Sequence, residues 1–359
     1  MRSSDYEKLA QRKWDSEILS YVAKIHEYKG RQELYIRQKP VELERLVEIA
    51  RVQSTEASNK IEGIVTTNTR IRQLVSDKTA PRNRDEKEIM GYRDVLNTIH
   101  ESHAFIPIRP AYILQLHRDL LKRTGLSYGG SFKNVQNYIN ETRPDGTQVT
   151  RFTPVAPYET PDAVAAICDS YARTLALEIL DPLLLIPAFI CDSLCIHPFN
   201  DGNGRMSRLL TLLLLYQNGF EVGKYISVEK EIERTKDVYY DVLEGADSGW
   251  HEEKNDYTPF IRYMLQVFLS CYVEFEERVG LMQESGARST AYDVVKAYAA
   301  SKVGKFSSAE AIAGCPSAGR SSVLSALKKL TDEGYLTRLK SGRNVAYVRS
   351  SSNTNHTVF

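Results

Sequence analysis

The sequence predicts a mainly α-helical protein with one β-hairpin inside its larger part and a small C-terminal domain of helices and a second hairpin. Apolar residues recur at helical spacing over most of the chain, which is typical of packed amphipathic helices. Residues 181–196 and 209–216 are almost wholly apolar and flank a short polar stretch, so we expect two buried helices there. Residues 290–348 show three short helical patterns followed by strand, turn and strand. With 359 residues, the chain is long enough for two or three domains.

Composition indicates an ordinary globular protein of a reducing compartment. Lys and Arg number 47 against 46 Asp and Glu, so the overall charge points to no particular partner. Within residues 286–350, however, 11 basic residues stand against 4 acidic ones. Five cysteines without paired spacing argue against a disulfide framework, and no apolar run reaches the about 18 residues that a membrane-spanning helix needs. The sequence therefore predicts a cytoplasmic protein without a membrane segment.

The first strong pattern after the amphipathic N-terminal residues is a helix from Pro40 to Gly63. Proline is favoured in the first helical turn and glycine just past the last one. The last turns of this helix read Ser58-Asn59-Lys60-Ile61-Glu62-Gly63. Ser58 and Glu62 lie four residues apart and so share one helix face. Alone, this short pattern indicates only a solvated helix end.

Helices are next expected at residues 86–100 and 111–124, where they supply core. Their histidines have no neighbouring carboxylates at the spacing of metal ligands, and we take them as structural: His100, His103 and His117.

Residues 126–156 change character and predict a β-hairpin. The segment Asn137-Tyr138-Ile139 lies before the turn Arg143-Pro144-Asp145-Gly146-Thr147, and residues 148–152 follow it. Further helices are expected at 158–180, at 231–246 and at 257–279.

The polar stretch between the two apolar helices reads His197-Pro198-Phe199-Asn200-Asp201-Gly202-Asn203-Gly204-Arg205-Met206-Ser207-Arg208. Its composition is suited to handling phosphate. Gly202 and Gly204 allow close approach of the backbone, and N–H groups at the start of the following helix can point at an anion. Arg205 and Arg208 lie three residues apart, so both project from the first turn and can bind phosphate oxygens.

Two further groups complete this chemistry. Asp201 is a hard oxygen ligand beside the glycines and is suited to a magnesium ion that bridges phosphates. His197 is the one group in the stretch that can take up a proton near neutral pH. A simple turn between helices is improbable for such a combination.

The stretch resembles the signature of the Fic-domain family, H-x-F-x-[D/E]-G-N-G-R-x-x-R, and every fixed position is present. The resemblance covers residues 40 to 275 and implies a Fic helical core with the hairpin as its flap. It also implies transfer of AMP from ATP to a Tyr, Ser or Thr hydroxyl of a target protein, with self-modification and with Mg²⁺ as cofactor.

The resemblance also implies a role for each residue. His197 is the general base for the hydroxyl, and Asp201 holds Mg²⁺ on the phosphates. Arg205 contacts the β-phosphate region and Arg208 the γ-phosphate. The implied nucleotide-binding residues are, in the motif, Gly202, Asn203, Gly204, Arg205, Met206, Ser207 and Arg208; in the flap, Asn137, Tyr138, Ile139 and Asn140; and at the adenine pocket, Tyr239, Tyr240 and Leu243. Asp247 stands where relatives often carry an asparagine that contacts the base.

The resemblance also extends to the end of the helix expected from Pro40 to Gly63. Ser58 to Gly63 is similar to the inhibitory motif [S/T]-x-x-x-E-[G/N] of many Fic proteins. The resemblance implies that Ser58, Glu62 and Gly63 are inhibitory, with Glu62 paired to Arg208 in the space that the γ-phosphate needs.

Residues 286–350 predict a winged-helix domain, with helices at 290–301, 307–313 and 317–333 and a polar tail at 351–359. The third helix is expected to bury Val323, Leu324, Leu327 and Leu330 and to present Arg320, Ser321, Ser322 and Lys328. A helix of this kind enters a DNA major groove or contacts a protein, and both partners stay open.

The predicted organisation is a helical region at 1–100, the catalytic core at 101–280 and the winged helix. Two other functions remain open. One is removal of AMP from a modified protein at the same site, and the other is a DNA-binding regulator that senses nucleotide. The target protein is unknown, and homodimers are frequent in the family.

Overall fold

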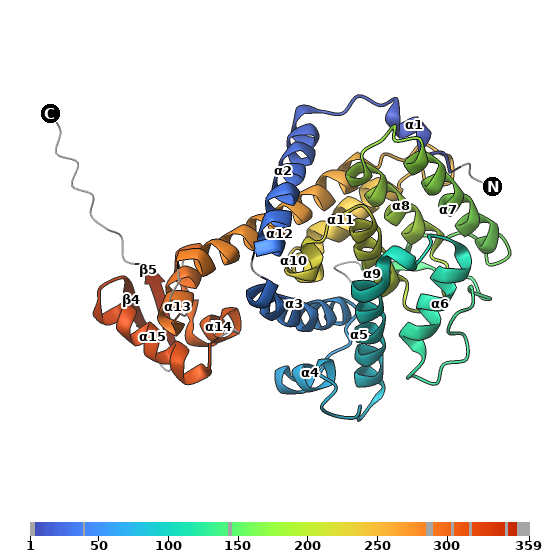
Figure 1. The fold of residues 1–359 in the computed structure, drawn as a ribbon. Helices are drawn as coiled ribbons and strands as arrows, with labels where there is room; N and C mark the ends of the chain where they lie inside the picture. Colours follow the sequence, from blue (N-terminus) through green and yellow to red (C-terminus); the bar gives the residue numbers. More distant parts are fainter. Residues whose placement is uncertain are drawn as a thin grey trace. The chain divides into compact units, whose positions relative to one another are not determined.

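The computed structural model describes residues 4–38, 40–142, 146–284, 290–302, 305–315, 318–341 and 344–349. The chain divides into two compact units, Met1–Phe275 and Glu276–Phe359. The first unit is a body of helices (Figure 1) with one hairpin, and the prediction of a mainly α-helical fold is confirmed.

The N-terminal helices of the first unit are α1 (Glu7–Ala10), α2 (Ser16–Gln38), α3 (Pro40–Ile61), α4 (Asn68–Val75), α5 (Arg84–Ser102), the short 3₁₀ turn His103–Phe105, and α6 (Pro110–Leu121). Helix α3 ends as its sequence predicts, because Gly63 takes a left-handed conformation with φ +79°. The last carbonyl of α3, that of Ile61, accepts a hydrogen bond from Lys236 Nζ at 2.8 Å.

The centre of the unit is the pair α8 (Pro182–Ile196) and α9 (Asn203–Gln217). Asp181 caps α8 by accepting a hydrogen bond from the Leu183 N–H at 2.8 Å. Helix α9 packs against α8, α5 and α3, and its side chains are buried almost all round, as expected for a helix without a polar face. The residues that join α8 to α9 are therefore held between buried elements.

Four further helices complete this part of the chain: α7 (Thr160–Ala176), α10 (Val228–Arg234), α11 (Lys236–Asp247) and α12 (Thr258–Glu284), with a 3₁₀ turn at Val222–Lys224. The prediction of a single helix at residues 231–246 is wrong. Thr235 lies outside helical geometry at φ −114° and ψ 30°, and it separates α10 from α11. Its hydroxyl bonds to the Glu231 carbonyl at 2.8 Å and lies 2.7 Å from the Tyr263 hydroxyl of α12, so Thr235 is held at the junction of the two helices.

A buried carboxylate fixes α8 to distant parts of the chain. Asp192 accepts hydrogen bonds from the hydroxyls of Tyr6 at 2.9 Å and Tyr257 at 2.6 Å, and from the indole N–H of Trp250 at 2.7 Å. The N-terminal segment and the start of α12 are thereby attached to the helix that ends at the polar stretch.

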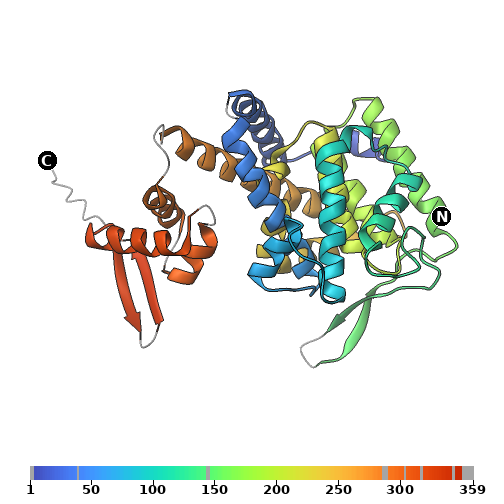
Figure 2. The ribbon, with the colours of Figure 1, turned by 60° about the horizontal axis from the view of Figure 1, so that its bottom comes forward.

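The predicted hairpin is formed by β1 (Ile139–Thr142) and β2 (Gln148–Phe152), which pair antiparallel. It projects from the helical body in Figure 2. Arg143, Pro144 and Asp145 of its expected turn lie outside the described residues.

The second unit contains α13 (Ala291–Ser301), α14 (Ser308–Gly314) and α15 (Arg320–Asp332), with the strands β3 (Phe306–Ser307), β4 (Leu336–Ser341) and β5 (Asn344–Arg349) in the order β3-β5-β4. These are the elements expected of a winged helix. Val323, Leu327 and Leu330 of α15 are buried, but Leu324 is 41% exposed, contrary to prediction, because it lies one residue outside the helical repeat of the other three. The tail at 351–359 lies outside the described residues, as do Gly342 and Arg343.

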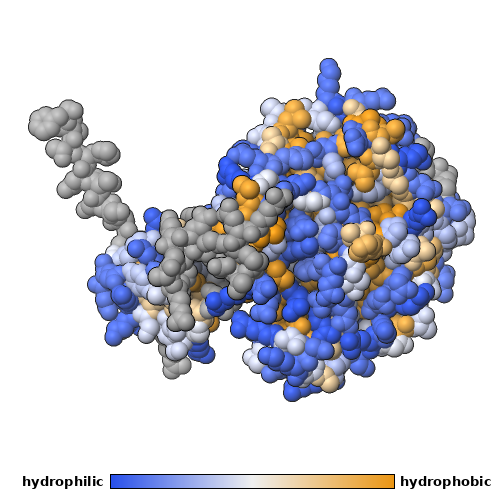
Figure 3. Space-filling model, viewed as in Figure 1, coloured by the Kyte–Doolittle hydropathy of each residue, from blue (hydrophilic) through white to orange (hydrophobic). Residues whose placement is uncertain are grey.

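None of the helices in the described part of the chain combines the length and apolarity needed to cross a bilayer. Figure 3 shows a mostly hydrophilic face in which hydrophobic residues form separate patches.

Candidate active site

His197 occupies the position directly after α8 and is held in an unusual backbone conformation. It is the C-cap of the helix, and its φ of +51° places a residue other than glycine in the left-handed region. Its Nδ1 lies 3.2 Å from the Leu194 carbonyl oxygen. Because a carbonyl only accepts, Nδ1 carries the proton and Nε2 keeps its lone pair. Burial lowers the pKa of His197 to about 4, so the ring is neutral at pH 7 and can accept a proton.

The loop after His197 is fastened from within. Asn203 accepts a hydrogen bond from the Phe199 N–H at 2.9 Å and donates one to the Phe199 carbonyl at 2.8 Å. Gly202 has φ +86°, which glycine adopts without strain. Gly202 thus serves the close turn at the start of α9, whereas Gly204 lies within the helix.

His117 of α6 also holds this loop. It is a structural residue, as predicted, but one that contacts the motif directly. Its Nδ1 accepts from the Gly130 N–H at 3.1 Å, which leaves Nε2 to donate to the Asp201 carbonyl at 3.0 Å. Its ring stacks on Phe199 with centroids 3.7 Å apart. The sequence spacing of His117 carries no sign of this contact.

Arg205 points into the protein and pairs with a carboxylate that sequence reasoning missed. Its Nη1 lies 2.7 Å from Glu88 Oε2 of α5, and its Nη2 lies 3.4 Å from Asp201 Oδ1. Glu88 also accepts a hydrogen bond from Arg84 Nε at 2.7 Å. One signal was available in the sequence: Glu88 falls on the same buried face of α5 as Tyr92 and Val95, where a carboxylate needs a partner.

Arg208 is bound by the end of α3. Its Nε donates to Ser58 Oγ, and its Nη2 donates to the Ser58 carbonyl and to Glu62 Oε1, each at 2.8 Å. Burial raises the pKa of Glu62, but Arg208, with Arg205 and Lys236, outweighs that effect and holds the pKa below its usual value. The structure therefore brings Ser58 and Glu62 together with Arg208.

The Glu62 carboxylate also lies against the first turn of α9. A Cβ placed on Gly204 would come within 2.2 Å of Glu62 Oε1, so a side chain at this position would displace the Glu62 carboxylate. The first N–H groups of a helix lack intrahelical acceptors and favour negative charge. The carboxylate thus stands beside the place that the sequence analysis assigned to a phosphate.

Asp201 presents a partly exposed carboxylate at the edge of the loop. Arg84 Nη2 lies 3.5 Å from its Oδ2. Within the described residues, no three His, Cys, Asp or Glu side chains converge in a way that could hold a metal ion. Asp201 is thus the motif carboxylate that could hold Mg²⁺ together with substrate phosphates, and this assignment stays a prediction.

The four flap residues differ in their contacts. Asn137 Nδ2 donates to the carbonyls of Phe199 at 3.0 Å and His197 at 3.3 Å, so its amide is already engaged with the motif backbone. Tyr138 is 56% exposed, and Ile139 and Asn140 begin β1. Only Asn137 of the four contacts the motif through a recorded hydrogen bond.

The residues assigned to the adenine pocket lie on α11. Tyr239 and Leu243 are buried, whereas Tyr240 is 41% exposed and meets Tyr239 edge to face at 5.3 Å. Asp247, at the end of the same helix, forms an ion pair with Arg151 of β2 at 2.8 Å. That pair connects the flap to α11.

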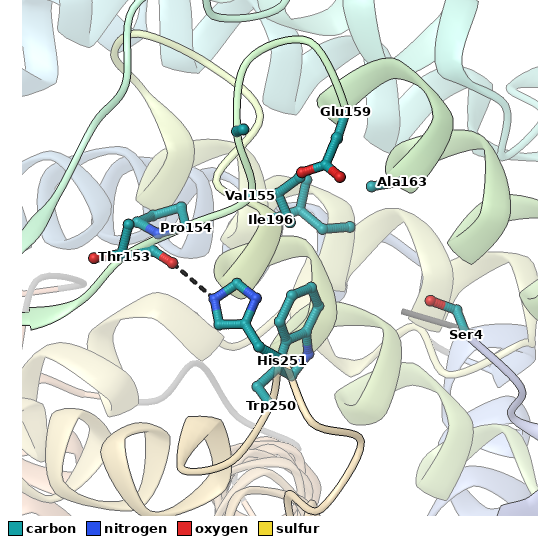
Figure 4. Close-up of a pocket in the computed structure, with 10 residues that line it drawn as sticks. Ser4, Thr153, Pro154, Val155, Glu159, Ala163, Ile196, Trp250 and His251 are labelled. Carbon is teal, nitrogen blue, oxygen red and sulfur yellow. Dashed lines mark hydrogen bonds between the residues drawn. The ribbon is translucent and has the colours of Figure 1, made fainter. Parts of the chain in front are cut away.

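A cavity of about 300 Å³ is lined in part by Ile196, the residue directly before His197. Trp250, His251 and Glu159 are among the residues that line it (Figure 4), and His251 Nε2 donates to the Thr153 carbonyl at 2.8 Å. None of residues 202–208 lines this cavity.

Comparisons with known proteins point to one family. Residues 107–215 match the family model described as the Fic/DOC family. The protein adenylyltransferase fic-1 of Caenorhabditis elegans is 29% identical over 186 residues, which are 50% of this chain and 32% of that protein. The protein adenylyltransferase Fic of Culex quinquefasciatus is 26% identical over 232 residues, which are 62% of this chain and 41% of that protein. The chain thus spans less than half the length of either relative.

Solved structures share the fold. The crystal structure of a Fic family protein from Desulfovibrio desulfuricans G20 superposes with a TM-score of 0.61 at 21% identity, covering 95% of this chain and 98% of that one. Fic-1 from C. elegans superposes with a TM-score of 0.56 at 20% identity, covering 75% of this chain and 74% of that one. At these identities the likeness concerns the fold alone.

Proposed function

The chain is a Fic-domain protein, and from that premise we propose that it is an autoinhibited protein adenylyltransferase, which transfers AMP from ATP to a hydroxyl of a target protein. The observation that carries the proposal is the complete motif, in which His197 ends α8 and the loop after it leads into the N-terminus of α9. The names of the curated relatives support the same reaction.

In the proposed reaction, His197 Nε2 takes the proton of the target hydroxyl. The hydroxyl oxygen attacks the α-phosphorus of ATP, a bond to AMP forms, and the bond to pyrophosphate breaks. The fixed tautomer of His197 supports this role, because Nδ1 is committed to the Leu194 carbonyl. Mg²⁺, held by Asp201, would neutralise charge on the phosphates.

Inhibition follows from Glu62. The γ-phosphate would need Arg208, whose guanidinium is bonded to Ser58 and Glu62. ATP bound with its γ-phosphate displaced would carry its α-phosphate out of line with the attacking oxygen. Since near-attack geometry is worth several kcal/mol of barrier, a small displacement suppresses the rate strongly.

The proposal is tested with ATP labelled at the α or the γ position, Mg²⁺, and the variant Glu62→Gly. We expect label on protein from the α position only, with a rate on the order of tenfold or more above that of the wild type. His197→Ala in the same background should lower the rate by about 10² to 10⁴ while ATP still binds. Transfer of γ-label, or a normal rate without His197, would refute AMP transfer by this base.

A second experiment distinguishes AMP transfer from AMP removal. An adenylylated target protein incubated with the wild type should release little AMP if transfer is the main activity. Rapid release that depends on Glu62 would instead assign removal of AMP to the wild-type protein.

The second unit is proposed to bind DNA or a protein through α15. Arg320, Ser321, Ser322 and Lys328 are exposed on this helix, as predicted. Binding of the full chain to a DNA duplex should weaken steeply with salt, because phosphate contacts release counterions. Binding that is absent or independent of salt would favour a protein partner. A homodimer remains a prediction from the family resemblance.

A further inference from the structure

Lys133, which lies between α6 and β1, is a buried lysine that the reaction described above does not use. It is only 3% exposed. Its ammonium donates to the Ile196 carbonyl at 3.0 Å and to Asn137 Oδ1 at 2.8 Å. In the part of the chain that the structure describes, no carboxylate forms an ion pair with it. A buried charge of this kind is costly unless its surroundings compensate for it.

The compensation comes from the end of α8. Ile196 is the last residue of that helix, and the last carbonyls of a helix lack intrahelical donors and carry partial negative charge. A lysine ammonium at this position satisfies such a carbonyl and interacts favourably with the helix dipole. Lys133 therefore caps the helix whose next residue is His197.

Lys133 and Asn137 together hold four consecutive carbonyls. The Lys133 side chain donates to the Ile196 carbonyl, and the Lys133 backbone N–H donates to the Pro198 carbonyl at 2.8 Å. The Asn137 amide, which accepts a hydrogen bond from Lys133, donates to the carbonyls of His197 at 3.3 Å and Phe199 at 3.0 Å. The backbone on both sides of the left-handed His197 is thus bound by one short segment.

On the basis of the proposed AMP transfer, we propose that Lys133 is a positioning residue, which holds His197 in its left-handed turn directly at the neighbouring carbonyls and through Asn137. Burial is the main cause of the lowered pKa of His197; the charge of Lys133 adds to it in an electrostatic role, whereas Glu62 at the end of α3 raises the pKa. Removal of Glu62 in the activated variant therefore leaves Lys133 as the charge that opposes protonation.

The proposal predicts a specific pH dependence. Burial lowers the pKa of Lys133 to about 8, so its positive charge is lost as the pH rises through that value. Transfer should then decline above about pH 8, because the charged cap of α8 is lost. An arginine at this position stays charged throughout and should show no such decline.

The test compares Lys133→Met and Lys133→Arg in the Glu62→Gly background, with the exposed Lys122→Met as a matched control. Lys133→Met should lower kcat by about 10- to 100-fold with little change in KM for ATP, because misplacement of the base affects the reaction and not nucleotide binding. Lys133→Arg should retain more activity and lack the decline above pH 8. Equal kcat and pH profiles in all variants would overturn the proposal.

A second readout is independent of transfer. NMR titration of the His197 ring, assigned by comparison with His197→Gln, gives its pKa in each variant. Lys133→Met should raise that pKa by on the order of 0.5, while Lys133→Arg and Lys122→Met leave it near the wild-type value. An unchanged pKa in a folded Lys133→Met protein overturns the electrostatic role even if no AMP transfer is found. Failure of transfer in every variant, with the pKa shift present, refutes the proposed function and leaves the electrostatic effect of Lys133 on His197 established.

Discussion

Arg205 and Arg208 leave the same turn of α9, and each meets a glutamate from another helix, but the two pairs differ in their surroundings. Glu88 belongs to the interior of α5, its side chain is 4% exposed, and it also binds Arg84. Glu62 follows the end of α3, and its side chain is 32% exposed. Arg205 is thus paired with a buried carboxylate, and Arg208 is paired with a partly exposed one.

This difference in exposure indicates which of the two glutamates a bound phosphate can replace. A phosphate that approaches the start of α9 meets Glu62 at an accessible helix end, whereas Glu88 is enclosed on all sides. Breaking the Arg205 pair leaves a buried guanidinium whose remaining carboxylate contact is that with Asp201 at 3.4 Å. Breaking the Arg208 pair leaves a guanidinium that still binds Ser58 twice and can accept a phosphate. We therefore regard the first pair as part of the fold and the second as the inhibitory contact.

The largest expected effect is on stability. Glu88→Ala should lower the free energy of unfolding by about 3 to 5 kcal/mol, because it leaves the buried Arg205 with only its longer contact to Asp201. Glu62→Ala should lower it by about 1 kcal/mol or less, since Arg208 keeps its two hydrogen bonds to Ser58. Urea denaturation of the two variants against the wild type measures the difference. Equal losses would remove the distinction between the pairs.

A smaller effect is expected at Ser58. Ser58→Ala removes the acceptor of the Arg208 Nε–H, but it leaves the Ser58 carbonyl and Glu62 on Nη2. The transfer rate should rise by about two- to threefold, as expected for one hydrogen bond of about 0.5 kcal/mol or slightly more. The rate with α-labelled ATP measures this change, and a rise as large as that of Glu62→Gly would assign the inhibition to Ser58 instead.

The smallest effect is expected from pH. Arg208 holds the pKa of Glu62 below its usual value, so the ion pair persists above that pKa and is lost only as the pH falls through it. The ratio of Glu62→Gly to wild-type rates should therefore change by less than about twofold between pH 5 and pH 8. A ratio that approaches one at pH 5 would mean that mild acid releases Arg208, contrary to this account.

Sequence reasoning succeeded where the signal is local. Helices α8 and α9 follow from continuous apolar runs, the glycines and arginines of the motif lie within one turn, and Ser58 and Glu62 share a helix face. It failed for Glu88, His117 and Lys133, because their partners lie far away along the chain and no spacing connects them. The break at Thr235 was missed because no glycine or proline marks it in the sequence.

The central claim is that Glu62 suppresses transfer by holding Arg208, and a double-mutant cycle tests it most directly. The rate of AMP transfer is measured for the wild type, Glu62→Gly, Arg208→Ala and the double variant, each checked for folding. The account predicts that Glu62→Gly alone is activated, by on the order of tenfold or more, and that the double variant is as slow as Arg208→Ala. A double variant as fast as Glu62→Gly, or a folded Glu62→Gly protein that binds ATP and gains nothing, would contradict it.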